Sequence, residues 1–186
     1  MTTASEFTIE DETVSAILAP YRDVFPADSD YEGYRNHCLR MMNVVLKLSD
    51  DAPNRLEKLR IAVAFHDLSV FPKRTLDYLD DSSELAAEYL NSIDRPEWEE
   101  EISSMINNHH KLTRYRGEFE NLVEPFRKAD WIDVTLGHVR FGLERDWVVG
   151  LHKALPLYTF YPRTMLKVIF GYVLRNPLAP LPNFKM

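Results

Sequence analysis

The sequence predicts an all-α protein built as a single domain. The chain has 186 residues, which is enough for one domain with a hydrophobic core and short for two. Six glycines is a low count for this length, and runs of β-branched residues are few, which favours helices over a sandwich or barrel. Apolar residues recur every three or four positions in one segment after another, as they do along the buried face of a helix.

The first expected helix covers about residues 10–21 and ends near Pro26. The second begins after Ser29 or Asp30, because both residue types are favourable N-caps. His37 lies beside the apolar face of this second helix. That face consists of Tyr34, Cys38, Met41, Val45 and Leu48.

A third helix is expected after Pro53. Its apolar residues recur at helical spacing, and the next position in that spacing is His66, which is followed directly by Asp67. The string Asp81-Ser82-Ser83-Glu84 predicts the start of a helix over residues 85–93, since a serine cap with an acid shortly after it stabilises a helix N-terminus.

The next helix opens at Arg95-Pro96, because proline is tolerated in the first turn. Its apolar face ends at His109, and residues 111–118 form a polar loop. A further helix covers about residues 122–136. Its inner face carries Leu122, Phe126, Ala129 and Asp133, with Asp130 one step round on a face shared with Val123 and Val134.

Beyond this body, a C-terminal extension over about residues 138–176 is expected to hold two or three helices separated by Pro156 and Pro162. An extended tail to residue 186 follows. The extension is aromatic, and core packing is the default interpretation, with a lid over a pocket or the surface of a homodimer as alternatives. The aromatic residues are Tyr158, Phe160, Tyr161, Phe170 and Tyr172.

Charge and composition exclude several classes of function. The net charge is −7, so binding to duplex nucleic acid through a basic surface is not expected. The basic residues gather toward the C-terminal end, which we interpret as a basic tail packed on an acidic body. The one cysteine, Cys38, cannot form an internal disulfide, and neither a secretory signal nor a membrane span is visible. These features predict a soluble cytoplasmic protein.

The residues that carry chemistry are histidines and aspartates near apolar helix faces. His37, His66 and His109 lie on or beside the faces of three different expected helices, and Asp67 and Asp130 accompany them. A buried ionised aspartate is costly unless it is paired or binds a metal. Imidazole and carboxylate together suit Mn, Fe, Co, Ni or Zn, with Mg as a further option.

Four strings, in order, resemble the motifs of the HD-domain metal-dependent phosphohydrolase superfamily. The first is Tyr34-Arg35-Asn36-His37-Cys38-Leu39-Arg40, and the second is Ala62-Val63-Ala64-Phe65-His66-Asp67-Leu68. The third is Ile106-Asn107-Asn108-His109-His110, and the fourth is Ala129-Asp130-Trp131-Ile132-Asp133. The resemblance covers about residues 30–136 and leaves the C-terminal 50 residues outside it.

The resemblance implies a helical bundle of the HD type, with the C-terminal helices as an addition. It implies a hydrolase of a small phosphate ester or nucleotide that uses metal-activated water. The implied metal ligands are His37, His66, Asp67 and Asp130, and Asp67 is also the residue that would bridge to a second ion.

Two departures from the family pattern matter. Members with two metals offer two further histidines after the doublet, but here Ser82 or Ser83 stands where one is expected. Adjacent residues such as His109 and His110 rarely serve two ligand positions, so one ion is favoured over two. The Glu-Asp pair of the alarmone-hydrolase branch is also absent after Asp67, which argues against that branch and leaves the general acid unassigned.

His109 and His110 have two interpretations of equal weight. One of them is a metal ligand or a general acid near the leaving group, or both are surface histidines at a helix C-terminus. Asp67, His109 and His110 are therefore the catalytic candidates.

Four basic residues follow the histidine motifs and are candidates for binding substrate phosphate, with solvated loop charge as the simpler interpretation. They are Lys73, Arg74, Lys111 and Arg114. Two other functions stay open. One is an HD-fold oxygenase with a diiron centre, and the other is a metal-binding module without turnover.

Overall fold

The structure is a computed structural model, and it describes residues 6–73 and 77–158. Within these residues the secondary structure is entirely helical, which confirms the all-α prediction. The elements are α1 (Glu12–Leu18), the 3₁₀ helix η1 (Ala19–Val24), α2 (Asp28–Leu48), α3 (Arg55–Phe65), α4 (Val70–Lys73), α5 (Leu79–Ser92), the 3₁₀ helix η2 (Pro96–Trp98), α6 (Glu99–Asn108), α7 (Glu120–Val134) and α8 (Arg145–Ala154).

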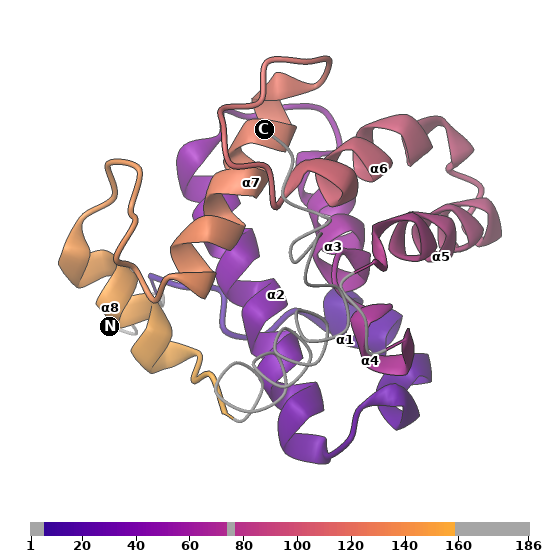
Figure 1. Ribbon diagram of the computed structural model, residues 1–186, viewed down its shortest axis with the longest axis horizontal. Helices are drawn as coiled ribbons and strands as arrows, with labels where there is room; N and C mark the ends of the chain where they lie inside the picture. The colour runs from indigo at the N-terminus through magenta and orange to yellow at the C-terminus, as the bar shows by residue number, and fades with distance from the viewer. Residues whose placement is uncertain (1–5, 74–76, 159–186) are drawn as a thin grey trace, which may run out of the picture.

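The long helix α2 runs through the middle of the molecule, with α7 alongside it (Figure 1). It spans 21 residues, and acidic Asp28 and Asp30 in its first turn complement the helix dipole. Every residue from Asn36 to Val45 is buried, because neighbouring helices cover this stretch on several sides. A polar side chain in this stretch therefore faces other protein groups instead of water.

The other helices enclose this pair. Helices α3 and α6 pack together, α5 pairs with α6, and α6 also contacts α7. In Figure 1, α8 lies on the other side of the α2–α7 pair from α5 and α6. Buried apolar side chains from α1 through α8 form one continuous cluster, so the described helices share a core.

Helix α5 begins earlier than its local sequence predicts. It starts at Leu79, and Asp81-Ser82-Ser83-Glu84 lies inside it instead of capping it. The reason is tertiary packing: Tyr78, Leu79 and Ser82 are all buried, so the first turn is held by the core. Of the three residues expected to share a face beside the inner face of α7, two are buried and one is not. Val134 is the last residue of the helix and is exposed, whereas Val123 and Asp130 are buried.

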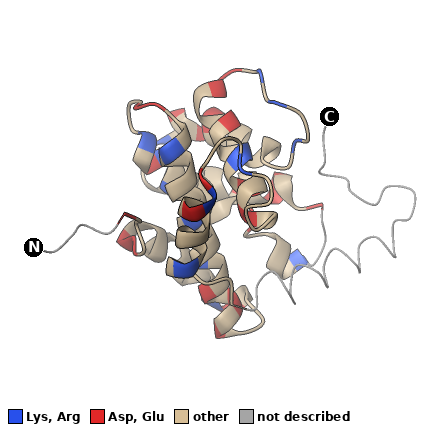
Figure 2. Ribbon diagram, turned by 90° about the vertical axis from the view of Figure 1, so that its left-hand side faces the viewer, with Lys and Arg blue, Asp and Glu red and all other residues tan. Residues whose placement is uncertain are grey.

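The surface carries both signs of charge. Lys and Arg are interspersed with Asp and Glu along the described helices (Figure 2). None of the described helices combines the length and the apolar character that crossing a membrane requires. Helix α8 is one of the helices expected in the C-terminal extension. The other expected helices, the tail, Phe160, Tyr161, Phe170 and Tyr172 lie outside the described residues.

Candidate metal centre

The four predicted metal ligands meet inside the helical bundle. His37 comes from α2, His66 and Asp67 directly follow α3, and Asp130 comes from α7. None of the four is more than 2% exposed. His37 Nε2 lies 2.9 Å from His66 Nε2, and 3.9 Å from both Asp67 Oδ2 and Asp130 Oδ1. The structure thus brings these residues together from segments far apart in the sequence.

The histidine rings are oriented by acceptors on their outer nitrogens. His37 Nδ1 lies 2.6 Å from Asp133 Oδ2, and His66 Nδ1 lies 2.9 Å from the Val63 carbonyl oxygen. A carboxylate and a carbonyl can only accept, so each Nδ1 carries the proton and each Nε2 presents its lone pair to the cluster. Two lone pairs 2.9 Å apart repel each other unless a proton or a metal ion lies between them.

A third histidine, His109, directly follows α6 and also faces the cluster. Its Nδ1 donates to the Ile106 carbonyl oxygen at 2.6 Å, and its Nε2 lies 3.2 Å from Asp67 Oδ1. The adjacent His110 also faces the cluster, with its Nε2 3.8 Å from Asp130 Oδ2. Neither histidine is exposed at a helix end. His109 is fully buried, and the side chain of His110 is 14% exposed.

The donor set fits a divalent metal ion. Asp130 Oδ1 is buried and has no hydrogen-bond partner among the described residues, which is costly for a carboxylate without a cation nearby. Three groups of residues could each hold an ion, because within each group the potential ligand atoms lie within 4.8 Å of one another. The groups are His37, His66 and Asp130; His66, Asp67 and His109; and His109, His110 and Asp130.

The pKa values of the two carboxyl groups of the cluster are shifted in opposite directions. Burial opposes ionisation of Asp67, yet the electrostatic interaction with the adjacent His66 imidazole and the hydrogen bond with His109 hold the pKa of Asp67 well below the usual range. Burial raises the pKa of Asp130 to about 7. Burial also lowers the pKa of His66 to about 3, which keeps that imidazole neutral and able to act as a ligand.

Two tyrosines that were not predicted as site residues hold Asp67. The Tyr34 hydroxyl donates to the Ala64 carbonyl oxygen at 3.0 Å and accepts from the Asp67 backbone N–H at 3.3 Å. The Tyr78 hydroxyl donates to Asp67 Oδ1. Burial raises the pKa of Tyr78 well above its usual range, so the phenol stays protonated as a donor. Periodicity treats both tyrosines as apolar, so no local signal marks their hydroxyl groups as part of the site.

Asp133 supports His37 and belongs to the same α7 turn as Asp130. Burial opposes its ionisation, but the Arg40 guanidinium and hydrogen bonds from His152 and His37 hold its pKa well below the usual range. Arg40 is fully buried, and its guanidinium donates to the Asp133 carboxylate beside the cluster. His152, which matches no family motif, also contacts this carboxylate.

The expected second histidine position is filled by a structural serine. Ser82 is fully buried, and its hydroxyl accepts a hydrogen bond of 3.4 Å from the Ser69 backbone N–H. Ser83 accepts from the Asn107 side chain at 3.1 Å. Both hydroxyl groups are thus used in packing α5 against its neighbours.

Two of the four basic candidates for substrate binding form ion pairs with acidic residues that are not part of the cluster. Lys73 pairs with Asp81 at 2.5 Å, and Arg114 pairs with Glu120 at 2.8 Å. The Lys111 carbonyl oxygen accepts hydrogen bonds from side chains of α7. Arg74 lies outside the described residues. A role in phosphate binding stays a prediction for all four.

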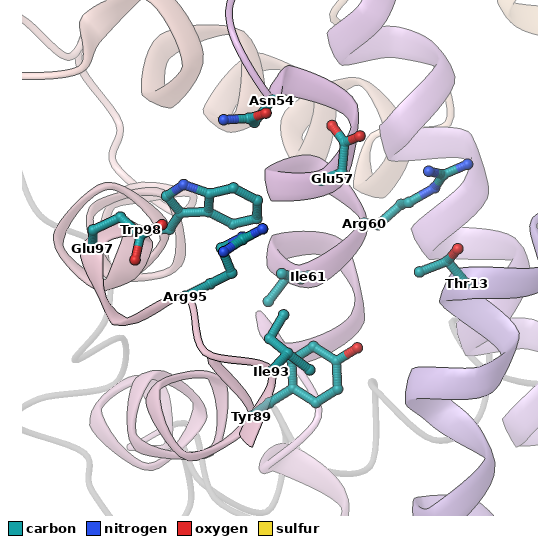
Figure 3. Close-up of a pocket in the computed structure, with 10 residues that line it drawn as sticks. All are labelled: Thr13, Asn54, Glu57, Arg60, Ile61, Tyr89, Ile93, Arg95, Glu97 and Trp98. Carbon is teal, nitrogen blue, oxygen red and sulfur yellow. The ribbon is translucent and has the colours of Figure 1, made fainter. Parts of the chain in front are cut away.

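A separate cavity of about 450 Å³ lies away from this cluster (Figure 3). None of the residues that line it is one of the predicted site residues. Two of its cationic side chains have partners nearby: Arg60 pairs with Asp11 at 2.8 Å, and the Arg95 guanidinium lies 5.5 Å from the Trp98 ring centre.

The fold and the site together define a class of protein: a helical domain with a buried cluster of histidine and aspartate that could hold a metal ion. The family model of the HD domain matches residues 34–135, which is more than half of the chain. The chain therefore belongs to the HD domain family. No curated protein matches the chain, and no solved structure does.

Proposed function

We propose that this protein is a metal-dependent hydrolase of a small phosphate ester or nucleotide. His37, His66, Asp67 and Asp130 would hold one divalent transition metal ion. The observation that carries the proposal is the pair of imidazoles whose Nε2 atoms face each other at 2.9 Å beside two buried carboxylates. Membership of the HD domain family, which consists largely of metal-dependent phosphohydrolases, supports the same reaction class.

A divalent ion bound there would supply Lewis acidity, lowering the pKa of a coordinated water and neutralising charge on phosphate oxygens. The protein's own residues would orient the ligands and exclude bulk water. The outer nitrogens of His37 and His66 are held by Asp133 and Val63, so neither ring can turn its inner nitrogen away. The Tyr78 hydroxyl holds one oxygen of Asp67 and leaves the other directed at the two histidines.

His109 and His110 are the candidates for handling a proton at the leaving group. They differ in environment although they are neighbours. Burial opposes protonation of His109. The hydrogen bond with Asp67 and the negative charge of Asp67 nevertheless raise the pKa of His109 above its usual value. Burial and the nearby His109 lower the pKa of His110 well below its usual value. We therefore prefer His109 as the proton carrier and His110 as a neutral group at the more exposed edge of the cluster.

The proposal is tested by metal analysis and a substrate screen on matched variants. Wild type, His66→Ala and His138→Ala are purified without added metal and analysed for Mn, Fe, Co, Ni and Zn. His138 is the control because it is exposed and its Nδ1 contacts the Thr135 carbonyl oxygen at its own helix end. We expect about one transition metal per chain in wild type and His138→Ala, none in His66→Ala, and phosphoester turnover that follows metal content. Absence of metal from wild type after soaking with Mn, Ni or Zn would overturn the proposal.

One observation favours a second candidate, a diiron oxygenase. Both His109 and His110 face the cluster, and together with Asp130 they form a third group of potential ligand atoms. This group offers donors for a second ion, which the spacing of adjacent residues did not lead us to expect. Two irons per chain together with substrate-dependent consumption of O₂ would select the oxygenase. One ion with phosphoester turnover would exclude it.

A further inference from the structure

The carboxylate of Asp133 is surrounded by donors from two neighbouring helices. Its Oδ2 atom accepts from His37 Nδ1 at 2.6 Å and from an Arg40 terminal nitrogen at 2.9 Å. Its Oδ1 atom lies 2.6 Å from Arg40 Nε and 3.1 Å from His152 Nε2. A carboxylate offers about four acceptor sites, so these contacts use all the hydrogen bonds that Asp133 can accept. The position of Asp133 is thus determined by α2 and α8 as well as by its own helix α7.

Helix α8 is attached to this same region of α2. Arg40 donates to the Leu155 carbonyl oxygen at 2.8 Å, and the Asn36 side chain donates to the Pro156 carbonyl oxygen at 2.9 Å. Val148, Leu151 and Leu155 are buried. The inner side of α8 thus places His152 beside Asp133, where the His152 side chain is only 16% exposed. Helix α8 lies beyond residues 34–135, the part of the chain that the HD domain model matches.

We propose that His152 is a positioning residue of the metal centre, acting on His37 through Asp133. His37 presents Nε2 to the cluster only while Asp133 accepts from its Nδ1. His152 restrains the oxygen of Asp133 that does not contact His37, so it limits rotation of the carboxylate about its Cβ–Cγ bond. Removal of such a supporting partner lowers metal affinity by about 10–100-fold in characterised sites.

This inference rests on the proposed function only in taking His37 as a metal ligand. It does not depend on the reaction or the substrate. The C-terminal extension thereby gains a specific role, because α8 supplies one donor to the carboxylate behind the metal ligand. The same contacts account for the burial of Arg40, whose guanidinium joins Asp133 to the end of α8.

The test compares His152→Ala, His152→Gln and Lys153→Ala in the full chain. Glutamine can donate from its side-chain amide near the position of the imidazole Nε2, so His152→Gln is the rescue variant. Lys153 is the matched control because it is the next residue of α8 and is exposed. Each chelator-stripped protein is titrated with Co²⁺, with the visible absorption of the ion as the readout of ligand geometry. Thermal unfolding and a ¹H–¹⁵N spectrum of the imidazoles are recorded on the metal-free proteins.

We expect His152→Ala to weaken Co²⁺ binding about 10-fold, to change the Co²⁺ spectrum and to shift the His37 imidazole resonances. His152→Gln is expected within about 3-fold of wild type, and Lys153→Ala unchanged. Wild-type affinity and an unchanged spectrum in His152→Ala would overturn the inference, even if the melting temperature fell. Weakened Co²⁺ binding without phosphoester turnover in wild type would leave the inference standing and reject the proposed function. No Co²⁺ binding by wild type would reject both.

Discussion

His37 and His66 are 29 positions apart, and their Nε2 atoms face each other at 2.9 Å inside the helical bundle. This relationship requires α2 to pack against the end of α3 with both rings turned inward. Because each ring donates outward from Nδ1, the contact is favourable only with a proton or a metal ion between the two nitrogens.

Metal removal is expected to destabilise the fold, because the ion would bind the folded cluster and not the unfolded chain. At a free metal concentration about 100 times its Kd, binding adds about 2.7 kcal/mol to the free energy of unfolding. Chelation should therefore lower the melting temperature of wild type, and added Mn²⁺ or Co²⁺ should restore it. The same additions should leave the melting temperature of His66→Ala unchanged. An equal response in both proteins would place the metal elsewhere.

Asp67→Ala is expected to abolish both metal binding and activity. Asp67 Oδ2 lies 3.9 Å from His37 Nε2 and 3.5 Å from His66 Nε2, so the variant loses the carboxylate that balances a bound cation. Elemental analysis and the phosphoester assay are run together, with Asp146→Ala on the exposed start of α8 as the control. Full activity of Asp67→Ala would show that the ligand assignment is wrong.

Tyr78→Phe is expected to keep the fold while weakening the metal centre. The ring is fully buried and stays in place, but Asp67 loses the hydroxyl that holds its Oδ1 atom. Loss of a supporting hydrogen bond of this kind reduces metal affinity or activity by about 10-fold or more. Co²⁺ titration of the chelator-stripped variant measures the effect. The control is Tyr115→Phe, whose hydroxyl contacts Ser104 and Glu118 and not the cluster. Equal affinities in the two variants would contradict the role given to Tyr78.

Metal affinity is expected to rise as the pH increases toward neutrality. The pKa of Asp130 in the metal-free protein is about 7 because of burial. Below that pH a proton occupies the carboxyl and competes with the metal ion, whereas above it the carboxylate is already ionised. The apparent Kd should therefore fall as the pH rises from about 5.5 to about 7 and change less above this range. A Kd that is independent of pH over this interval would argue against Asp130 as a ligand.

Arg40→Leu is expected to cost about 3–5 kcal/mol of stability, because it leaves the buried Asp133 carboxylate without its main cation. Arg114→Leu provides the comparison, since its ion pair with Glu120 is largely exposed and such pairs contribute less than about 1 kcal/mol. Urea unfolding of both variants against wild type measures the difference. Equal losses would mean that Arg40 does not stabilise the fold through Asp133.

The sequence by itself determined the class of fold and the main members of the cluster. Apolar periodicity placed His37, His66 and His109 at buried faces of separate helices, and the HD resemblance grouped them with Asp67 and Asp130. Both inferences use information that lies along the chain. The helical period is a local property, and the order of the motifs can be recognised without knowing how the helices pack. The prediction of a single metal ion remains a prediction, as do the roles of the individual residues.

Only the tertiary structure decided which groups support these residues. Tyr78 contacts Asp67 because the first turn of α5 packs in the core. The helix therefore begins before Asp81–Glu84, where the local sequence predicts its cap. His152 contacts Asp133 because α8 packs on α2 through Arg40. Side-chain contacts between distant segments depend on how whole helices pack and turn. That packing is set by the fit of many side chains at once, and no local pattern in the sequence encodes it.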